Sequence, residues 1–132
     1  MEQKIIIGVV SVLIIGAVGI FVFVPQTATA PGSVPAGKYT AFADCITQSG
    51  SKFFGAFWCP HCAAQKALFG DAVKNLPYIE CSNPDGQSQT QVCKDNGVSS
   101  YPTWVFPDHS TTTGEVPLAT LAAKTSCTLP AE

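Results

Sequence analysis

Two cysteines stand two residues apart in the segment 57–66, which reads FWCPHCAAQK. Cys59 and Cys62 could form a reversible redox couple, half of a zinc site or a permanent structural cross-link. A permanent disulfide at this spacing is strained and closes little loop entropy, so it would stabilise the fold poorly. Zinc normally takes its second ligand pair at close spacing, but Cys81 and Cys93 have eleven residues between them. We therefore expect a redox couple and no metal.

The residues around this pair predict which cysteine attacks. Pro60 is tolerated in the first turn of a helix, so Cys59 is expected at the helix N-terminus. Unpaired N–H groups and the positive end of the helix dipole favour a thiolate there. We expect Cys59 to be the exposed nucleophile and Cys62, one turn further on, to be the more buried resolving thiol. His61 would stabilise the thiolate further, and a stabilised reduced form makes the disulfide a stronger oxidant.

Helices and strands alternate around the cysteine pair, which predicts an α/β fold. The apolar, aromatic run at 52–58 lacks alternation, as expected for a central strand that is covered on both faces. Residues 60–76 predict a helix that Gly70 loosens midway. Other helices are expected at 39–49, 87–96 and 117–124, and other strands at 78–81, 103–106 and 111–116. Strands separated by helices predict parallel crossovers, and the last two strands predict an antiparallel hairpin.

The N-terminal region contains an uncharged apolar run of twenty residues at 5–24. A helix of that length spans roughly 30 Å, the thickness of a bilayer's hydrocarbon core. The A-x-A sequence at 28–30 also allows a secretory signal that is removed, although the run exceeds the roughly 7–15 residues usual for a signal core. We expect a single-pass membrane anchor at 1–24, a linker at 25–38 and a domain at 39–132 outside the cytoplasm.

The composition supports an exported domain. The 132 residues include six cysteines, no arginine and a net charge of −2. Exported proteins keep disulfides, and phosphate binding needs clustered Lys and Arg, so nucleic acid is not an expected partner. Beyond the redox pair, the remaining cysteines allow three connectivities. Our first choice is Cys81 with Cys93, worth about 3 kcal/mol; this leaves Cys45 with Cys127. The alternative is that Cys81 and Cys93 form a second exchanging pair.

Four segments together carry a family resemblance: FFGAFWCPHCAAQKALFG (53–70), LPYIEC (76–81), QTQVCKDNGV (89–98) and YPTW (101–104). They resemble the thioredoxin-like domain that is fused to, or a partner of, bacterial vitamin K epoxide reductase homologues. The similarity covers about residues 39–127. It implies a thioredoxin-like fold, with a four-stranded mixed sheet flanked by helices.

The same resemblance implies a function. The domain would be a membrane-tethered thiol–disulfide oxidoreductase that oxidises cysteine-containing exported proteins. A separate, quinone-linked vitamin K epoxide reductase-like membrane enzyme would reoxidise it. The redox-active disulfide Cys59–Cys62 would do the chemistry, with no bound cofactor. Two alternatives stay open: a reductase or isomerase with the electron flow reversed, and a non-catalytic binding domain stapled by its disulfides.

The resemblance also assigns residues to a substrate site. Pro102 occupies the cis-proline position of thioredoxin folds, which would bring the Tyr101 backbone beside Cys59 to pair with an extended substrate. Trp58 and Thr103 are expected to contact the substrate as well.

Three further aromatic or acidic residues bear on the same site. Trp104 is expected as a strand residue that helps to line it. Phe53 stands where many thioredoxins carry a buried carboxylate that assists proton transfer to the second cysteine. Glu80, at a strand end, is the substitute that we consider for that carboxylate.

Overall fold

The computed structural model describes residues 34–132. The predicted anchor at 1–24 and most of the predicted linker at 25–38 lie outside these residues. Within the described part of the chain, no helix is both long and apolar enough to cross a membrane. The elements in chain order are α2 (Thr40–Gln48), β1 (Lys52–Gly55), α3 (Pro60–Ala67), the 3-10 helix η2 (Gly70–Asn75), β2 (Tyr78–Glu80), α4 (Gln91–Asp95), β3 (Thr103–Val105), β4 (Thr111–Thr113) and α5 (Leu118–Thr125).

The strands form one mixed sheet in the order β2-β1-β3-β4. β1 runs parallel to β2 and antiparallel to β3, and β4 pairs with β3 as the predicted hairpin. The expected parallel crossover into β3 is therefore wrong. The connection from β2 to β3 contains only the five-residue α4, which does not carry the chain back along the sheet, so β3 starts from the end where β1 finishes.

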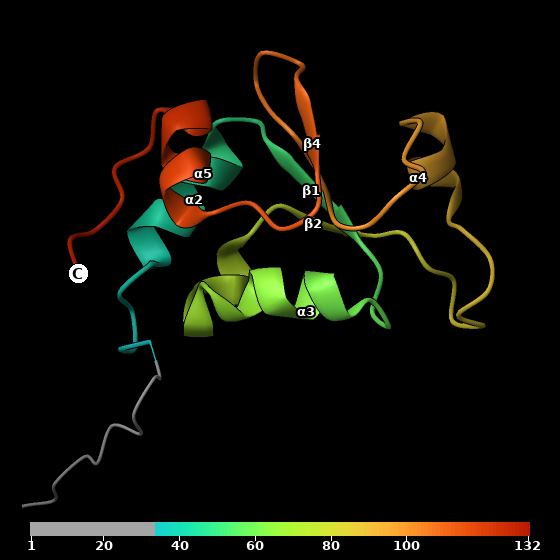
Figure 1. Cartoon of the computed structure of the whole chain (residues 1–132), viewed down its shortest axis with the longest axis horizontal. Coiled ribbons are helices and arrows are strands. Elements are labelled where there is room, and N and C mark those ends of the chain that lie inside the picture. The colour runs from blue at the N-terminus through green and yellow to red at the C-terminus, as the bar shows by residue number, and fades with distance from the viewer. Residues whose placement is uncertain (1–33) are drawn as a thin grey trace, which may run out of the picture.

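The helices lie at different ends and sides of the sheet (Figure 1). α3 runs along one side, α2 and α5 lie side by side at one end, and α4 lies at the other end. The predicted helix at 60–76 is broken in two. Gly70, at φ +56°, lies outside the right-handed helical region, so α3 stops before it and η2 begins there.

β1 separates two apolar clusters because successive side chains of a strand point to opposite faces. On one face, Phe53 stacks on Trp104 of β3 with ring centroids 4.5 Å apart. Trp104 is fully buried there, so the expectation that it lines the active site is wrong. Side chains from α2, η2 and α5 complete this main core: Phe42, Ala43, Ile46, Ala72 and Leu121. On the other face, Phe54 packs with Val98 and a cysteine pair.

Two disulfides cross-link elements of this fold. Cys45 of α2 is bonded to Cys127 after α5, with Cα atoms 5.9 Å apart and a sequence separation of 82. Cys81, at the end of β2, is bonded to Cys93 of α4, with Cα atoms 5.5 Å apart. This is one of the three connectivities that the sequence allows. It leaves Cys59 and Cys62 as free thiols.

Candidate active site

The two free thiols lie at the start of α3, directly after the turn that follows β1. Cys59 is the N-cap residue and Pro60 is at the first helical position. The Sγ of Cys59 accepts a hydrogen bond from the backbone N–H of Cys62 at 3.3 Å. One of the unpaired donors at the helix N-terminus therefore points at the Cys59 sulfur, where it favours negative charge.

Both cysteines are buried, as the sequence predicted for Cys62 but not for Cys59. Cys59 is 5% exposed and Cys62 is 1% exposed, so the expectation that Cys59 is exposed is wrong. The turn before the helix folds back, with the Cys59 N–H donating to the Ala56 carbonyl at 3.0 Å, and Tyr101 packs against the pair. Tyr101 therefore helps to cover Cys59.

Cys62 keeps its proton more strongly than an ordinary thiol. Burial is the main cause, and the hydrogen bond with Cys59 adds to it; together they raise the pKa of Cys62 to about 12. Cys62 is therefore the buried thiol that the sequence predicted for the resolving position. The second thiol stays protonated until a nearby group removes its proton.

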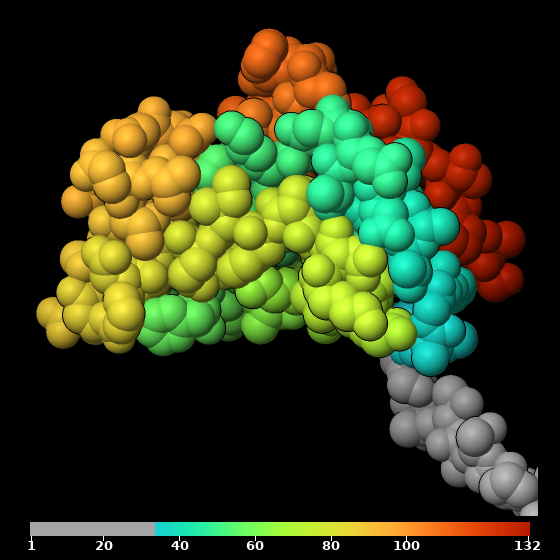
Figure 2. All heavy atoms as spheres, turned by 180° about the vertical axis from the view of Figure 1, so that it is seen from behind, coloured from blue at the N-terminus to red at the C-terminus, as the bar shows by residue number. Residues whose placement is uncertain are grey.

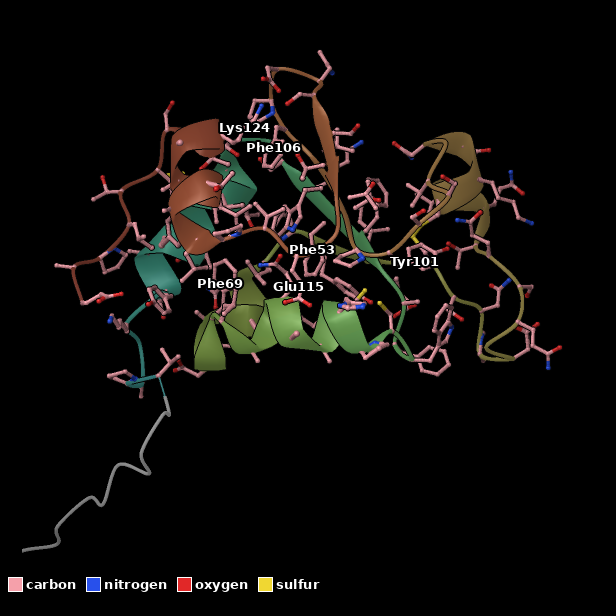
Figure 3. The ribbon with its side chains drawn as sticks, in the orientation of Figure 1. Phe53, Phe69, Tyr101, Phe106, Glu115 and Lys124 are labelled. Atoms are coloured by element: carbon pink, nitrogen blue, oxygen red, sulfur yellow. A yellow bond between two sulfur atoms is a disulfide. The ribbon has the colours of Figure 1, made fainter. Side chains whose placement is uncertain are left out.

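His61, between the two cysteines, points to a partner that the sequence did not reveal. Its Nδ1 lies 2.7 Å from Oε1 of Glu115, which comes from the segment between β4 and α5. Glu115 lies over α3 in Figure 3. Because 54 residues separate the two side chains, no local pattern could predict the contact. A protonated His61 would form an ion pair there that is largely open to solvent.

Gln65 of α3 binds the segment between β4 and α5 through two buried hydrogen bonds. Its Nε2 donates to the Val116 carbonyl at 3.1 Å, and its Oε1 accepts from the Val116 N–H at 2.6 Å. Gln65 is fully buried. The chain from Gly114 to Val116 therefore forms one fixed wall of the site, and its Gly114 N–H donates to the Pro102 carbonyl at 2.8 Å.

Tyr101 and Trp58 form the opposite wall. The Tyr101–Pro102 peptide bond is cis, and Pro102 is buried. The Trp58 ring meets the Tyr101 ring edge to face at 5.9 Å, and its Nε1 donates to Ser82 Oγ at 3.0 Å. Trp58 is still 52% exposed, and its neighbour Phe57 is 59% exposed. Two aromatic rings are therefore presented to solvent next to Cys59.

A pocket of about 130 Å³ opens beside Trp58 and Tyr101, against the 82–89 turn. Figure 2 shows the segment that precedes α3 next to this turn, at the lower edge of the molecule.

Thr103, which was expected to contact substrate, is not part of the wall that Tyr101 and Trp58 form. It pairs with Phe54 in the sheet register, its Oγ1 donates to the Ser100 carbonyl at 2.8 Å, and it is 8% exposed. Its side chain therefore lies on the face of β3 away from the thiols.

Among residues 34–132, no group of three or more His, Cys, Asp or Glu side chains is arranged to hold a metal ion. The two free cysteines are the chemically reactive groups that the geometry brings together. A nucleophilic Cys59 and a protonated Cys62 lie in one helical turn, between an aromatic wall and a fixed backbone wall. Such a pair can form a mixed disulfide at Cys59 and resolve it through Cys62.

Comparison with known proteins agrees with this geometry. The family model described as Thioredoxin matches residues 38–125. The thiol-disulfide oxidoreductase LTO1 of Arabidopsis thaliana is 40% identical over 94 residues, which are 67% of this chain and 24% of that protein. The chain thus spans about a quarter of the length of this curated relative. The match to the family model covers most of the chain, including the cysteine pair and the proline loop, and the chain belongs to the thioredoxin family.

Proposed function

We propose that the protein is a thiol–disulfide oxidoreductase that works through the Cys59–Cys62 pair. One observation carries the proposal: Cys59 caps α3 and its sulfur accepts the Cys62 N–H, while Cys62 is buried and protonated one turn away. The name of the Arabidopsis relative supports the same activity, although the match covers only 24% of that protein.

We further propose that the exchange runs toward oxidation of the substrate. A substrate thiolate attacks Cys59 of the disulfide, the Cys59–Cys62 bond breaks, and Cys62 leaves with the electron pair. The second substrate thiolate then attacks the substrate sulfur of the mixed disulfide and expels Cys59 as a thiolate. Two electrons have then passed to the protein. The helix N-terminus stabilises this expelled thiolate, and a stabilised reduced form makes a stronger oxidant.

The proposed setting is the outer side of a membrane. The apolar run at 5–24 would tether the domain, and the substrates would be cysteine-containing exported proteins. A quinone-linked vitamin K epoxide reductase-like membrane enzyme would take the two electrons back from Cys59 and Cys62. The two cross-linked pairs support an oxidising compartment, because cytosolic thiols are kept reduced.

The second candidate is a reductase or isomerase that uses the same residues. The raised pKa of Cys62 favours it, because a resolving thiol that stays protonated lets a mixed disulfide persist long enough to rearrange. The two candidates differ in the equilibrium potential of the pair.

Two measurements test the proposal. Refolding of a reduced, disulfide-containing substrate protein should be accelerated by the wild type and not by Cys59→Ser; equal rates would exclude catalysis. The reduction potential of the Cys59–Cys62 couple, measured against glutathione, should be more positive than the value of about −270 mV of thioredoxin. A reduction potential equal to or more negative than that of thioredoxin would contradict the assignment as an oxidase. The variant Cys62→Ser should trap substrates and the reoxidising partner as mixed disulfides.

A further inference from the structure

The pocket beside Trp58 and Tyr101 adjoins the reactive pair. Trp58 directly precedes Cys59 in the chain, and Tyr101 packs against Cys59. Both aromatic residues also line the pocket, and the turn at 82–89 forms its other side. An extended chain advances only about 3.3–3.6 Å per residue. When a substrate sulfur is bonded to Cys59, the residues next to the substrate cysteine therefore have the pocket within reach.

Hydrogen bonds hold the walls of the pocket in place. Ser82 Oγ accepts the indole N–H of Trp58 at 3.0 Å. Gln89 Nε2 donates to the Tyr101 hydroxyl at 2.7 Å and to the Val98 carbonyl at 2.7 Å. The volume of about 130 Å³ is smaller than the roughly 300–1,000 Å³ of small-molecule sites. The pocket is therefore preformed and suits one side chain of a substrate.

The eight residues that line the pocket are uncharged, but two carboxylates are hydrogen-bonded to them. Asp85 Oδ1 accepts the N–H groups of Gln87 at 2.9 Å and Ser88 at 3.0 Å, and its Oδ2 accepts the Ser88 hydroxyl at 2.7 Å. Glu80 Oε1 accepts the N–H group of Ser82 at 2.8 Å. Each carboxylate thus contacts the wall of the pocket directly.

Asp85 stays negatively charged over the whole pH range in which thiols exchange. The hydrogen bond from the Ser88 hydroxyl and those from the N–H groups of Ser88 and Gln87 lower the pKa of Asp85 to about 2. Asp85 is exposed, and the turn at 82–89 contains no Lys, Arg or His that would neutralise it. A molecule that approaches the pocket therefore meets a negative charge.

The aromatic side of the pocket favours the same kind of occupant. Trp58 is 52% exposed and meets the Tyr101 ring edge to face at 5.9 Å. The face of an aromatic ring attracts cations, and indole does so most strongly. Gly86 brings the turn close to this indole, because a Cβ built on Gly86 would lie 3.9 Å from Trp58 Cδ1. A positively charged side chain on the indole would therefore also be close to the turn that carries Asp85.

We propose that this pocket selects substrates that carry a lysine or arginine within two residues of the reacting cysteine, and that Asp85 determines this preference. The proposal rests on the proposed function and deepens it, because it names the class of substrate. The basic side chain lies on the Trp58 ring while the substrate sulfur is bonded to Cys59. No covalent bond forms or breaks in the pocket, so the selectivity changes how fast a substrate docks and leaves the exchange chemistry as it is.

The test compares dithiol peptides that differ in one residue next to the attacking cysteine: Lys, Gln, Glu or Leu. Each peptide reduces the Cys59–Cys62 disulfide of the full chain at neutral pH, and stopped-flow tryptophan fluorescence gives the rate constant. Each rate constant is divided by that of the same peptide with bis(2-hydroxyethyl) disulfide, because a neighbouring charge also alters the reactivity of the peptide thiol.

The normalised rates should follow the charge of the variable residue. At low ionic strength the Lys peptide should react roughly 3- to 10-fold faster than the Gln peptide, since exposed cation–π contacts and charge pairs each contribute a few-fold. The Glu peptide should be the slowest. In about 1 M salt, where charges are screened beyond roughly 3 Å, the advantage of the Lys peptide should shrink.

Two variants locate the effect at the pocket. Asp85→Asn keeps an oxygen that can accept the N–H groups of Gln87 and Ser88 but removes the charge. It should lower the preference for Lys about two- to fivefold and leave the rate with the Gln peptide unchanged. Gln87→Lys adds a positive charge to an exposed residue of the lining, so it should reverse the order of the Lys and Glu peptides. The matched control is Asp95→Asn, an exposed carboxylate of α4 that accepts from Gln91; it should keep the wild-type order.

Three outcomes would contradict the selectivity: equal normalised rates for the Lys, Gln and Glu peptides, a Leu peptide that reacts faster than the Lys peptide, or an unchanged order in Gln87→Lys. In each case, oxidation of the peptides that depends on Cys59 leaves the proposed function standing. If no peptide is oxidised in a Cys59-dependent way, the proposed function fails and the selectivity fails with it.

Discussion

The two faces of β1 carry two cysteine pairs with different fates. On the Gly55 face, Cys59 and Cys62 are free, are placed at a helix N-terminus and lie near ionisable side chains. On the Phe54 face, Cys81 and Cys93 are both fully buried and are joined in a disulfide.

The neighbours of the second pair explain its different fate. Cys81 and Cys93 pack with Phe54 and Val98, and with the partly buried Ile79, Tyr101 and Val105. Reaction at a sulfur requires a thiolate, and an apolar, closed environment disfavours one. Cysteines at a helix N-terminus can thus react, whereas cysteines in an apolar, closed environment form a structural cross-link.

The comparison is tested most severely by removing the nucleophilic sulfur from the first pair and both sulfurs from the second. Cys59→Ala should lower the rate of disulfide exchange on the order of 1000-fold, as expected when a nucleophile is deleted. The double variant Cys81→Ala/Cys93→Ala should retain most of the activity under conditions where it is folded. Both are measured by refolding of a reduced substrate protein. Loss of activity in the double variant with an intact fold would show that Cys81 and Cys93 exchange electrons after all.

The two structural disulfides should stabilise the fold by different amounts, and the disulfide that closes the longer loop should contribute more. Removing Cys45–Cys127, with a separation of 82, should lower the free energy of unfolding by about 4.5 kcal/mol in the chain-entropy model. Removing Cys81–Cys93, with a separation of 12, should lower it by about 3 kcal/mol. Urea denaturation of the paired alanine variants measures both. The reverse order would mean that local packing outweighs loop entropy at these positions.

Filling the gap at Gly55 should damage the reactive face alone. A Cβ there would lie 2.8 Å from Tyr78 Cε2 and 3.0 Å from Cys62 Sγ, so Gly55→Ala forces both side chains to move. We expect a loss of about 1–3 kcal/mol in the free energy of unfolding, as in overpacked cores. Slower exchange should accompany it. The exposed Ser99→Ala serves as the control, and a Gly55→Ala variant with wild-type stability would contradict the close contact.

The pH dependence of stability should reveal the buried thiol. The pKa of Cys62 rises from 9.0 in the unfolded chain to about 12 in the fold, so above pH 9 the unfolded chain loses this proton first. Stability that is fully present below pH 9 is therefore lost as the pH rises toward 12. In the Cys59→Ser variant, the free energy of unfolding should fall by about 1 kcal/mol by pH 10, relative to Cys59→Ser/Cys62→Ser. Parallel pH profiles of the two variants would contradict a buried, protonated Cys62.

Local patterns in the sequence accounted for the elements near the cysteine pair. Pro60 after Cys59 predicted the helix start, the apolar run at 52–58 predicted the central strand, and Gly70 marked a weak point in the predicted helix, which the structure shows to be a break. These signals act over a few residues. The strand proved shorter than its apolar run, because residues 56–58 leave the sheet for the turn that places Cys59 at the helix N-terminus.

The features that were missed depend on contacts between distant segments. The direction of β3, the burial of Cys59 under Tyr101 and the pairing of His61 with Glu115 all join residues far apart in the chain. The hydrogen bond between Tyr78 and Glu80 was also missed, although their i, i+2 spacing on a predicted strand places both side chains on one face. That spacing is the one signal that could have linked them beforehand.

Gln65 makes one side of the site around the thiols more rigid than the other. Its buried amide satisfies both the N–H and the carbonyl of Val116, and pulling that segment away would break both hydrogen bonds and leave the buried amide without partners. The Glu115 side must therefore travel with α3 as one body. The aromatic side chains of Phe57 and Trp58, which are about half exposed, are not held in this way, so adjustment to a bound molecule would fall to them.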